Sequence, residues 1–107
     1  MRENYIDQVC DVVALIPEGK VSTYGAIADY LALGSARMVG WALNKSFSAP
    51  IVVPAHRVVN SKGELSGRNS FAHPKMMEEL LKLEGVQVKN DKIVNFAATL
   101  WKPADHL

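Results

Sequence analysis

The sequence predicts a single, mainly α-helical domain over residues 1–107, with a helix-turn-helix of the winged-helix kind and a short β hairpin or wing. Three observations support this fold class. The first 45 residues contain three apolar stripes at helical spacing, separated by turn residues. Later in the chain, short β-branched runs flank turn sequences, as in a small hairpin. The length of 107 residues and the hydrophobic content of 49% suit one packed core and no second domain of ordinary size.

A first helix is predicted by an apolar stripe that ends before Pro17. Its members recur every three or four residues and are Ile6, Val9, Cys10, Val13 and Ile16. Because Cys10 is the one cysteine of the chain, we expect neither an intrachain disulfide nor a multi-cysteine zinc site. Cys10 lies on the apolar stripe without a basic neighbour at helical spacing, so we expect a buried structural thiol.

A helix-turn-helix is predicted by two short helices joined through Gly34. Either Ser22 or Thr23 can cap the first of these helices. Ser35 can cap the second, which we expect to run from Ala36 to about Lys45. Helical bundles share this pattern, so the helix pair alone leaves both interpretations open.

The second half of the chain alternates short extended runs with one helix. Runs of β-branched residues predict short strands at 51–53, 57–59, 86–88 and 92–94. Turn residues separate them at 60–63 and at 90–91. Between these runs, a helix is predicted from about Pro74 to Gly85.

The charges are unevenly distributed along the chain. Twelve Lys and Arg against eleven Asp and Glu give a net charge of +1, which excludes a strongly cationic nucleic-acid binder of the histone kind. Residues 34–68, however, hold five basic side chains against Glu64 alone, a net charge of +4. This middle segment is the candidate anion-facing surface, and a solvated loop region is the alternative.

Two charged residues are unfavourably placed for a purely structural role. Arg37 falls in the first turn of its predicted helix, where a cation opposes the helix dipole by about 0.3–1 kcal/mol. Glu84 shares a stripe with Leu80 and Leu81, so it points toward the core and needs a partner such as His56 or Arg57. The structural alternatives are a solvated arginine and a carboxylate that reaches water at the helix end.

Three blocks of sequence form a distinctive ordered set. The blocks read IPEGKVSTYG at 16–25, ARxVGxAL at 36–43 and VPAHRVV at 53–59, and the match continues to Glu84-Gly85. Over about residues 5–86 the chain resembles the DNA-binding, active-site domain of O6-alkylguanine-DNA alkyltransferases. The family's nucleophile lies in a Pro-Cys-His-Arg motif, and here the motif reads Pro54-Ala55-His56-Arg57. With Ala in the nucleophile position, the chain resembles the alkyltransferase-like proteins, which do not transfer.

The resemblance implies that catalysis has been lost. In the family a thiolate attacks the alkyl carbon, a His activates the thiol and a Glu orients the His. His56 and Glu84 match the base and the orienting residue, but the methyl side chain of Ala55 has no lone pair for the attack. We therefore expect a protein that is not an enzyme, with no cofactor and no metal. The retained His56–Glu84 pair is expected to hold its loop in shape.

The resemblance also implies binding in the minor groove and flipping of the damaged base out of the duplex. The implied DNA- and lesion-binding set is Tyr24, Ala36, Arg37, Gly40, Ala55, Arg57, Val58 and Arg68. Arg37 matches the finger that fills the vacated space, and Tyr24 matches the residue that meets the flipped base. Arg68 is expected to face the alkylated base as a cation. Asn44 is a weak candidate for a loop-supporting asparagine, and residues 70–74 have no clear counterpart.

These expectations define the predicted function. The chain is expected to bind O6-alkylguanine in double-stranded DNA without transferring the alkyl group, and to signal to nucleotide-excision-repair damage recognition proteins of the UvrA type. Because the N-terminus carries no apolar run, we expect a soluble cytoplasmic protein, nucleoid-associated when bound to DNA, with no membrane partner. We also expect a monomer. The alternatives are a helix-turn-helix regulator of undamaged DNA and an enzyme that uses His56 as a base.

Overall fold

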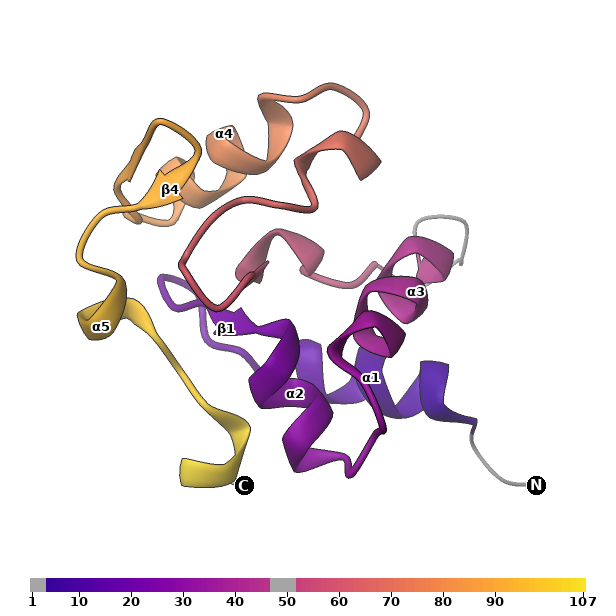
Figure 1. Cartoon of the computed structure of the whole chain (residues 1–107). Helices are drawn as coiled ribbons and strands as arrows, with labels where there is room; N and C mark the ends of the chain where they lie inside the picture. Colours follow the sequence, from indigo (N-terminus) through magenta and orange to yellow (C-terminus); the bar gives the residue numbers. More distant parts are fainter. Residues whose placement is uncertain (1–3, 47–51) are drawn as a thin grey trace.

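Three packed helices form the N-terminal half of the chain, and the structure, a computed structural model, describes residues 4–46 and 52–107. The helices are α1 (Tyr5–Val13), α2 (Tyr24–Tyr30) and α3 (Ala36–Ser46). Helix α3 packs against both α1 and α2, and the turn between α2 and α3 completes the predicted helix-turn-helix (Figure 1).

Short polar side chains set the helix starts. Thr23 Oγ1 accepts a hydrogen bond from the Ala26 amide at 3.0 Å, so Thr23 rather than Ser22 caps α2. Ser35 Oγ accepts from the Arg37 amide at 3.0 Å at the start of α3. The caps therefore place Tyr24 and Arg37 in the first turns of their helices.

Two helix ends differ from the prediction. Helix α2 ends at Tyr30 and not at Gly34, because Ala32 already adopts a left-handed φ of 56°. Helix α1 ends at Val13, while Ile16 remains buried in the turn that follows. The expected burial of Cys10 is only partly correct, since its side chain is half-buried.

A two-stranded parallel pair joins the two halves of the molecule. Strand β1 (Ser22–Thr23) pairs with β2 (Val58–Val59), in the register Ser22 to Val58 and Thr23 to Val59. Neighbouring residues of a strand point to opposite faces, so Val58 enters one core cluster and Val59 the other. The predicted strand at 51–53 is wrong for Val52 and Val53, which form no strand, and Ile51 lies outside the described residues.

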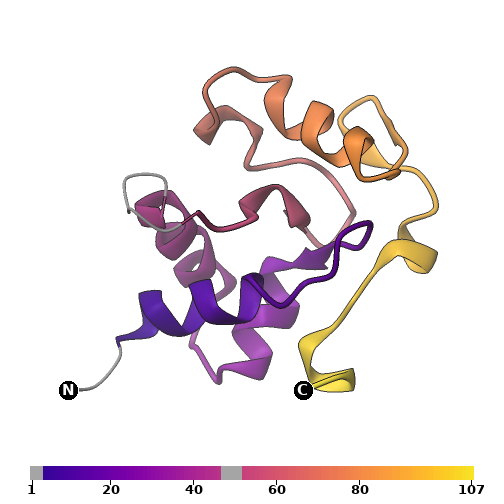
Figure 2. The same ribbon diagram turned by 180° about the vertical axis from the view of Figure 1, so that it is seen from behind.

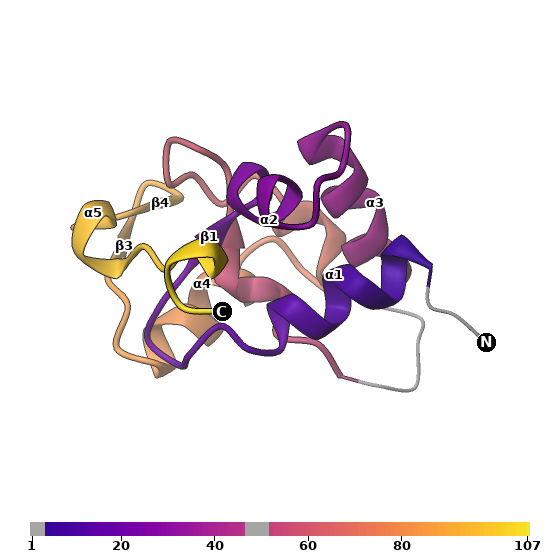
Figure 3. The ribbon, with the colours of Figure 1, turned by 90° about the horizontal axis from the view of Figure 1, so that it is seen from below.

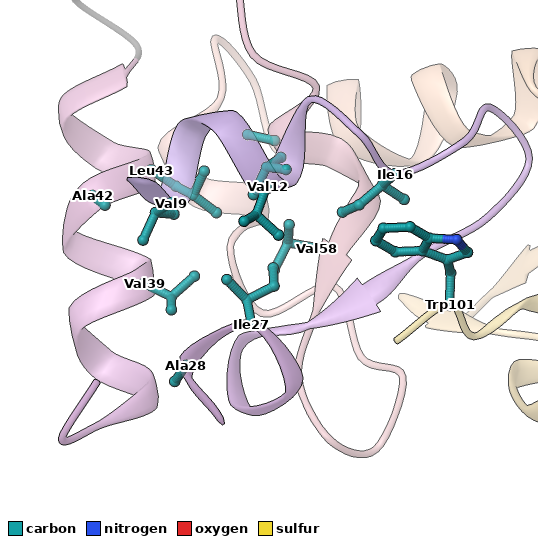
Figure 4. Close-up of a cluster of buried hydrophobic side chains, with 12 residues drawn as sticks. Val9, Val12, Ile16, Ile27, Ala28, Val39, Ala42, Leu43, Val58 and Trp101 are labelled. Atoms are coloured by element: carbon teal, nitrogen blue, oxygen red, sulfur yellow. The ribbon is translucent and has the colours of Figure 1, made fainter. Parts of the chain in front are cut away.

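The first core cluster is shown in Figure 4, where helices α1, α2 and α3 and strand β2 converge. Its buried members are Val9, Val12, Val13, Ile16, Ile27, Ala28, Val39, Ala42, Leu43, Ala55, Val58 and Trp101. Ala55 belongs to this cluster because it begins the short 3-10 helix η1 (Ala55–Arg57), which leads into β2. The nucleophile-equivalent position is thus fixed by the same core that holds the helix-turn-helix.

The second half is built around α4 (Met76–Leu83) and the antiparallel hairpin of β3 (Val88–Lys89) and β4 (Lys92–Ile93). Asn90 and Asp91 have left-handed φ values of 53° and 58°, as a tight two-residue hairpin turn requires. The hairpin is therefore confirmed around its predicted turn, but its strands differ from 86–88 and 92–94, because Val86, Gln87 and Val94 lie outside β3 and β4. The predicted helix is also confirmed, starting at Met76 instead of Pro74. Figure 2 shows these elements at the opposite end of the molecule from α1.

The second core cluster lies beneath α4 and the hairpin. Its buried members are Val21, Val59, Leu65, Met77, Leu81, Val86 and Ile93, and Phe71 packs against both clusters. The segment between β2 and α4 includes the short 3-10 helix η2 (Arg68–Ser70) and runs between the two halves. Loop residues from this segment therefore face the helix-turn-helix.

The C-terminal segment, with α5 (Phe96–Thr99) and the 3-10 helix η3 (Pro103–Asp105), returns to β1. The Val21 amide donates to the Thr99 carbonyl at 3.0 Å, and the Trp101 amide donates to the Val21 carbonyl at 2.7 Å. Figure 3 shows this segment, in yellow, beside β1 and α2. The mainly helical fold with short strands is as predicted. Within residues 4–46 and 52–107, no helix is long and apolar enough to span a membrane.

Candidate nucleic-acid interface

A cavity of about 190 Å³ opens where α2, α3 and the loop before α4 meet. It is lined by Tyr24, Gly40, Leu43, Asn44, Ala55, Ser66, Gly67, Ser70, Phe71 and Met77. The lining combines apolar walls with a few hydroxyl and amide groups, which is typical of a site for a flat, partly polar ligand. Ala55 contributes a methyl group at the position where the family motif has its nucleophile.

The phenol of Tyr24 closes one side of this cavity. A β-carbon added at Gly67 would lie only 2.6 Å from Tyr24 Oη, so the hydroxyl rests against bare backbone. Burial raises the pKa of Tyr24, and a hydrogen bond with the Ser66 side chain partly offsets that rise. The hydroxyl is therefore protonated at neutral pH and can donate a hydrogen bond.

Behind the cavity, the carboxylate of Glu84 binds the two residues that follow Ala55. His56 Nε2 lies 2.6 Å from Glu84 Oε2. Arg57 donates from Nε to Oε1 at 3.0 Å and from Nη2 to Oε2 at 2.8 Å, a bidentate pair. The predicted need of Glu84 for a partner is met by His56 and Arg57 together. Arg57 Nη1 also donates to the Ile16 carbonyl at 2.8 Å.

The Glu84 cluster extends to the turn before β1. The Gly19 amide donates to Glu84 Oε1 at 3.2 Å, and Gly19 has a left-handed φ of 86° that a side chain would strain. Burial raises the pKa of Glu84, but the hydrogen bonds from Arg57, His56 and Gly19 outweigh it and lower the pKa to about 2. Glu84 is therefore ionised at neutral pH.

The contact with Glu84 determines which ring nitrogen of His56 donates a hydrogen bond. An ionised carboxylate can only accept hydrogen bonds, so His56 Nε2 carries the proton. Its Nδ1 is then free of a proton in the neutral ring and could accept one from a neighbouring thiol. At position 55 that thiol is absent, because the residue is Ala.

Cys10 does not replace the missing nucleophile. It lies on α1, and burial followed by the charges of Asp7 and Asp11 raises its pKa. A raised pKa keeps the thiol protonated and unreactive at neutral pH. Cys10 is also not among the residues that line the cavity.

A second, wider hollow of about 370 Å³ lies on the outer face of α3. It is lined by Tyr24, Ala36, Arg37, Gly40, Trp41 and Asn44. Tyr24, Gly40 and Asn44 line both hollows, so the two hollows adjoin. Among the described residues, the Arg37 guanidinium has no hydrogen-bond or ion-pair partner. An exposed, uncommitted cation therefore lies at the mouth of the site.

The structure brings together five of the eight predicted DNA-binding residues, namely Tyr24, Ala36, Arg37, Gly40 and Ala55. The other three lie elsewhere. Arg57 is held by Glu84, and Val58 is fully buried in the core. Arg68 donates from Nη1 to the Leu65 carbonyl at 2.9 Å, and its Nε lies 3.6 Å from Asp91 Oδ2. None of the three lines either hollow, and their predicted DNA roles remain predictions.

The structure also adds residues that the sequence did not single out. Ser66, Gly67 and Ser70 line the cavity, and Trp41 lines the outer hollow. The Ser-Gly composition of the loop and the spacing of Trp41, one helical turn after Arg37, were the available signals. Asn44, a weak candidate from the sequence, lines both hollows. Within residues 4–46 and 52–107, no group of three His, Cys, Asp or Glu side chains could hold a metal ion.

Comparison with known proteins identifies the family. Residues 4–86 match the family model for the DNA-binding domain of 6-O-methylguanine DNA methyltransferase. The chain belongs to this family. The matched range contains every residue that lines the two hollows, so the whole candidate interface falls within the family domain.

The relatives in this family include both short and long proteins. Alkyltransferase-like protein 1 of Schizosaccharomyces pombe is 39% identical over 106 residues, covering 94% of this chain and 97% of that protein. A DNA base-flipping protein of Vibrio parahaemolyticus is 34% identical over 104 residues, covering 94% and 99%. The methylated-DNA–protein-cysteine methyltransferase of Methanothermobacter thermautotrophicus is 38% identical over 85 residues, covering 79% of this chain but 46% of the methyltransferase.

A solved structure has the same fold. The crystal structure of the S. pombe protein in complex with damaged DNA containing O6-carboxymethylguanine matches this chain with a TM-score of 0.80 at 38% identity. The match covers 96% of this chain and 100% of that one. The predicted family and fold class are therefore confirmed.

Proposed function

We propose that this chain recognises O6-alkylguanine in double-stranded DNA, flips the damaged base into the cavity and does not transfer the alkyl group. One observation carries the proposal: Ala55 stands at the cavity wall while the His56–Glu84 pair behind it is complete. A site that keeps its architecture and lacks its attacking atom is suited to holding a damaged base. The solved complex of the S. pombe relative with damaged DNA supports this proposal.

The geometry suits binding of an extrahelical base. Flipping a base costs a few kcal/mol of lost stacking and pairing, less for a damaged base. Arg37 projects from the first turn of α3 beside the hollow and would fill the space that the base leaves. Tyr24 lines both hollows, so it would contact the nucleotide as it passes from the duplex into the cavity. Ser66, Ser70 and Asn44 offer hydrogen-bonding groups to the base edge.

The test compares two duplexes that differ only in the alkyl group. We expect tighter binding to a duplex with O6-methylguanine than to the same duplex with guanine, measured by fluorescence polarisation. Arg37→Ala should remove most of this preference and most of the signal of a fluorescent base that reports flipping. Lys62→Ala is the matched control, because it removes the same charge from an exposed turn outside both hollows. Equal affinities for the two duplexes would reject damage recognition and favour the regulator of undamaged DNA.

The absence of transfer has its own test. Incubation of the wild-type chain with the alkylated duplex should leave the adduct intact by mass spectrometry of the DNA. Ala55→Cys would restore a thiol beside His56, whose Nδ1 can accept the proton. We expect Ala55→Cys to acquire the alkyl group as a protein adduct, and Ala55→Ser, with a far weaker nucleophile, not to. Appearance of unmodified guanine with the wild-type chain would show that it is an enzyme.

A chain that binds the lesion without repairing it needs a partner that completes the repair. We propose nucleotide-excision-repair damage recognition proteins of the UvrA type as that partner, and a cytoplasmic monomer that associates with the nucleoid on damaged DNA. A purified recognition protein of this type should form a larger complex with the chain and the alkylated duplex than with either alone. An unchanged complex size would contradict the handover.

A further inference from the structure

Trp41 leaves a large apolar side chain in solvent on α3. Its exposed fraction is 54%, whereas Trp101 is only 7% exposed and stacks on His106 with ring centroids 5.2 Å apart. Within the described residues, Trp41 has neither a ring partner nor a hydrogen bond. An exposed indole without an intramolecular role marks a contact surface for a partner.

The position of Trp41 ties it to the candidate interface. It lies four residues after Arg37, one helical turn along the same side of α3, and both line the outer hollow. Gly40 lies beside Tyr24, since a β-carbon at Gly40 would stand 4.0 Å from Tyr24 Cε1, and both residues line the outer hollow together with Trp41. The outer hollow adjoins the cavity, so Trp41 lies next to the site proposed for the flipped base.

We propose that Trp41 is a DNA-contacting residue whose indole packs against the deoxyribose rings of the minor-groove wall beside the flipped nucleotide. This inference rests on the proposed function. The minor groove is about 6 Å wide and a helix with its side chains about 10–12 Å across, so only small residues can approach the groove floor. Ala36 and Gly40 occupy those positions on α3, and the large side chain beside them must meet the wall.

The chemistry of the wall suits an indole. Deoxyribose presents apolar carbon edges between phosphates, and an indole can cover them without neutralising a charge. No acidic side chain lines the outer hollow, so the surface accepts a polyanion. A second copy of this chain is a poorer occupant, since a two-fold contact through this face of α3 would bring the two Arg37 side chains together. Because the deoxyribose is the same in every nucleotide, a contact with it does not distinguish the alkylated from the undamaged duplex. The contact should therefore strengthen binding to both duplexes.

The test uses the two duplexes of the proposed function. We expect Trp41→Ala to weaken binding to the alkylated and the undamaged duplex alike, by about tenfold, as for loss of a buried aromatic contact. The ratio of the two affinities should stay at its wild-type value. The slope of log affinity against log salt should also be unchanged, because no phosphate contact is lost. Trp41→Phe should recover part of the affinity, and Leu83→Ala, which removes another exposed apolar side chain on α4, should have no effect.

Tryptophan emission gives a second readout. The chain has two tryptophans, so the emission difference between wild type and Trp41→Phe belongs to Trp41. We expect a saturating concentration of duplex to quench the emission of Trp41. Trp41→Ala affinities within twofold of wild type, or an emission that DNA leaves unchanged, would overturn the assignment. A loss confined to the alkylated duplex would also overturn it, because a wall contact does not sense the alkyl group. If the wild-type chain binds no duplex, the proposed function itself fails and this inference with it.

Discussion

At the residue scale, the cavity depends on Gly67 having no side chain. The Tyr24 hydroxyl rests where a β-carbon of residue 67 would stand, at 2.6 Å. The φ of Gly67 is −90°, which alanine adopts freely, so the glycine is required by the contact and not by the backbone. The close approach of the Tyr24 hydroxyl to the Gly67 backbone holds the phenol against one wall of the cavity.

Gly67→Ala should therefore impair binding more than folding. The new methyl group displaces the Tyr24 phenol toward the cavity and narrows the space for a base. The loss of unfolded-state entropy stabilises the fold by about 0.4–1 kcal/mol and offsets part of the steric cost. We expect affinity for the alkylated duplex to fall by about tenfold or more, with a thermal midpoint within a few degrees of wild type. Gly34→Ala is the control, since a β-carbon there meets nothing within 4 Å. Equal binding by both variants would show that Tyr24 does not gate the cavity.

The charge of Glu84 contributes to the stability of the fold. Its pKa of about 2 lies below its unfolded value of about 4.5, so ionised Glu84 stabilises the folded state. That stabilisation is fully present above about pH 4.5 and is lost as the pH falls toward 2. At neutral pH this stabilisation is on the order of 3 kcal/mol, which follows from the difference between the two pKa values. The Glu84 side chain is only 11% exposed, so solvent screens its contacts with His56 and Arg57 weakly.

Glu84→Gln should lower the free energy of unfolding by on the order of 3 kcal/mol at pH 7, since Arg57 is left without its counter-ion. The difference from wild type should shrink steadily below about pH 4.5 and vanish only as the pH falls through about 2. Urea unfolding at a series of pH values measures this. Glu79→Gln on the same helix is the control, because Glu79 is 64% exposed and its pairing with His73 at 3.6 Å should contribute under 1 kcal/mol. A difference that is constant with pH would contradict the assignment.

At the element scale, the first turn of α3 is less stable than it could be, because it carries a cationic residue of the candidate interface. Its first turn contains Arg37 and no acidic residue, although the helix dipole favours acidic side chains there. The guanidinium has no partner within the described residues to compensate for this placement. The helix start is held instead by the Ser35 cap.

A substitution of Arg37 should therefore change the free energy of unfolding and the DNA affinity in opposite directions. Arg37→Glu should raise the free energy of unfolding by about 0.3–1 kcal/mol, because an anion in the first turn complements the dipole. The same change should abolish detectable binding to either duplex, since a carboxylate would face the phosphates. Chemical denaturation and fluorescence polarisation measure the two effects. A variant that is less stable than wild type would refute the dipole argument, whatever its DNA affinity.

Helix starts and turns that depend only on neighbouring residues were predictable from the sequence. Thr23 and Ser35 cap their helices through hydrogen bonds two or three residues away, and the Asn90-Asp91 turn needs only its own residues. The predicted strand at 51–53 failed where it is described, because a β-branched run forms a strand only with a partner strand, and none pairs with Val52 or Val53.

Long-range partners were not predictable in the same way. Glu84 had two candidate partners in the sequence, and the structure joins both to one carboxylate. Arg68 pairs with Asp91, which lies 23 positions later in a hairpin turn, and no local sequence pattern predicts this pair. The cavity itself is assembled from α2, α3, η1 and the loop before α4, so its polar lining from Ser66 to Ser70 emerged only in three dimensions.

At the scale of the whole molecule, the segment 34–68 carries a net charge of +4, yet two of its five cations are held by carboxylates of the same chain. Arg57 is neutralised by Glu84, and Arg68 is paired with Asp91. Arg37 has no partner among the described residues and lies at the hollow. Part of the positive charge of this segment is therefore neutralised by carboxylates of the same chain.

This distribution predicts a shallow salt dependence. Each phosphate neutralised contributes about −0.9 to the slope of log affinity against log salt on duplex DNA. Because Arg57 and Arg68 are already held by carboxylates, we expect a slope no steeper than about −3 for the alkylated duplex, measured from 50 to 300 mM salt. Arg37→Ala should make the slope less steep by about one. A wild-type slope of about −5 would mean that Arg57 and Arg68 leave their carboxylates on binding DNA. A shallow slope leaves most of the specific affinity to contacts with the flipped base, which is the property a damage-recognition protein needs on a genome of undamaged sites.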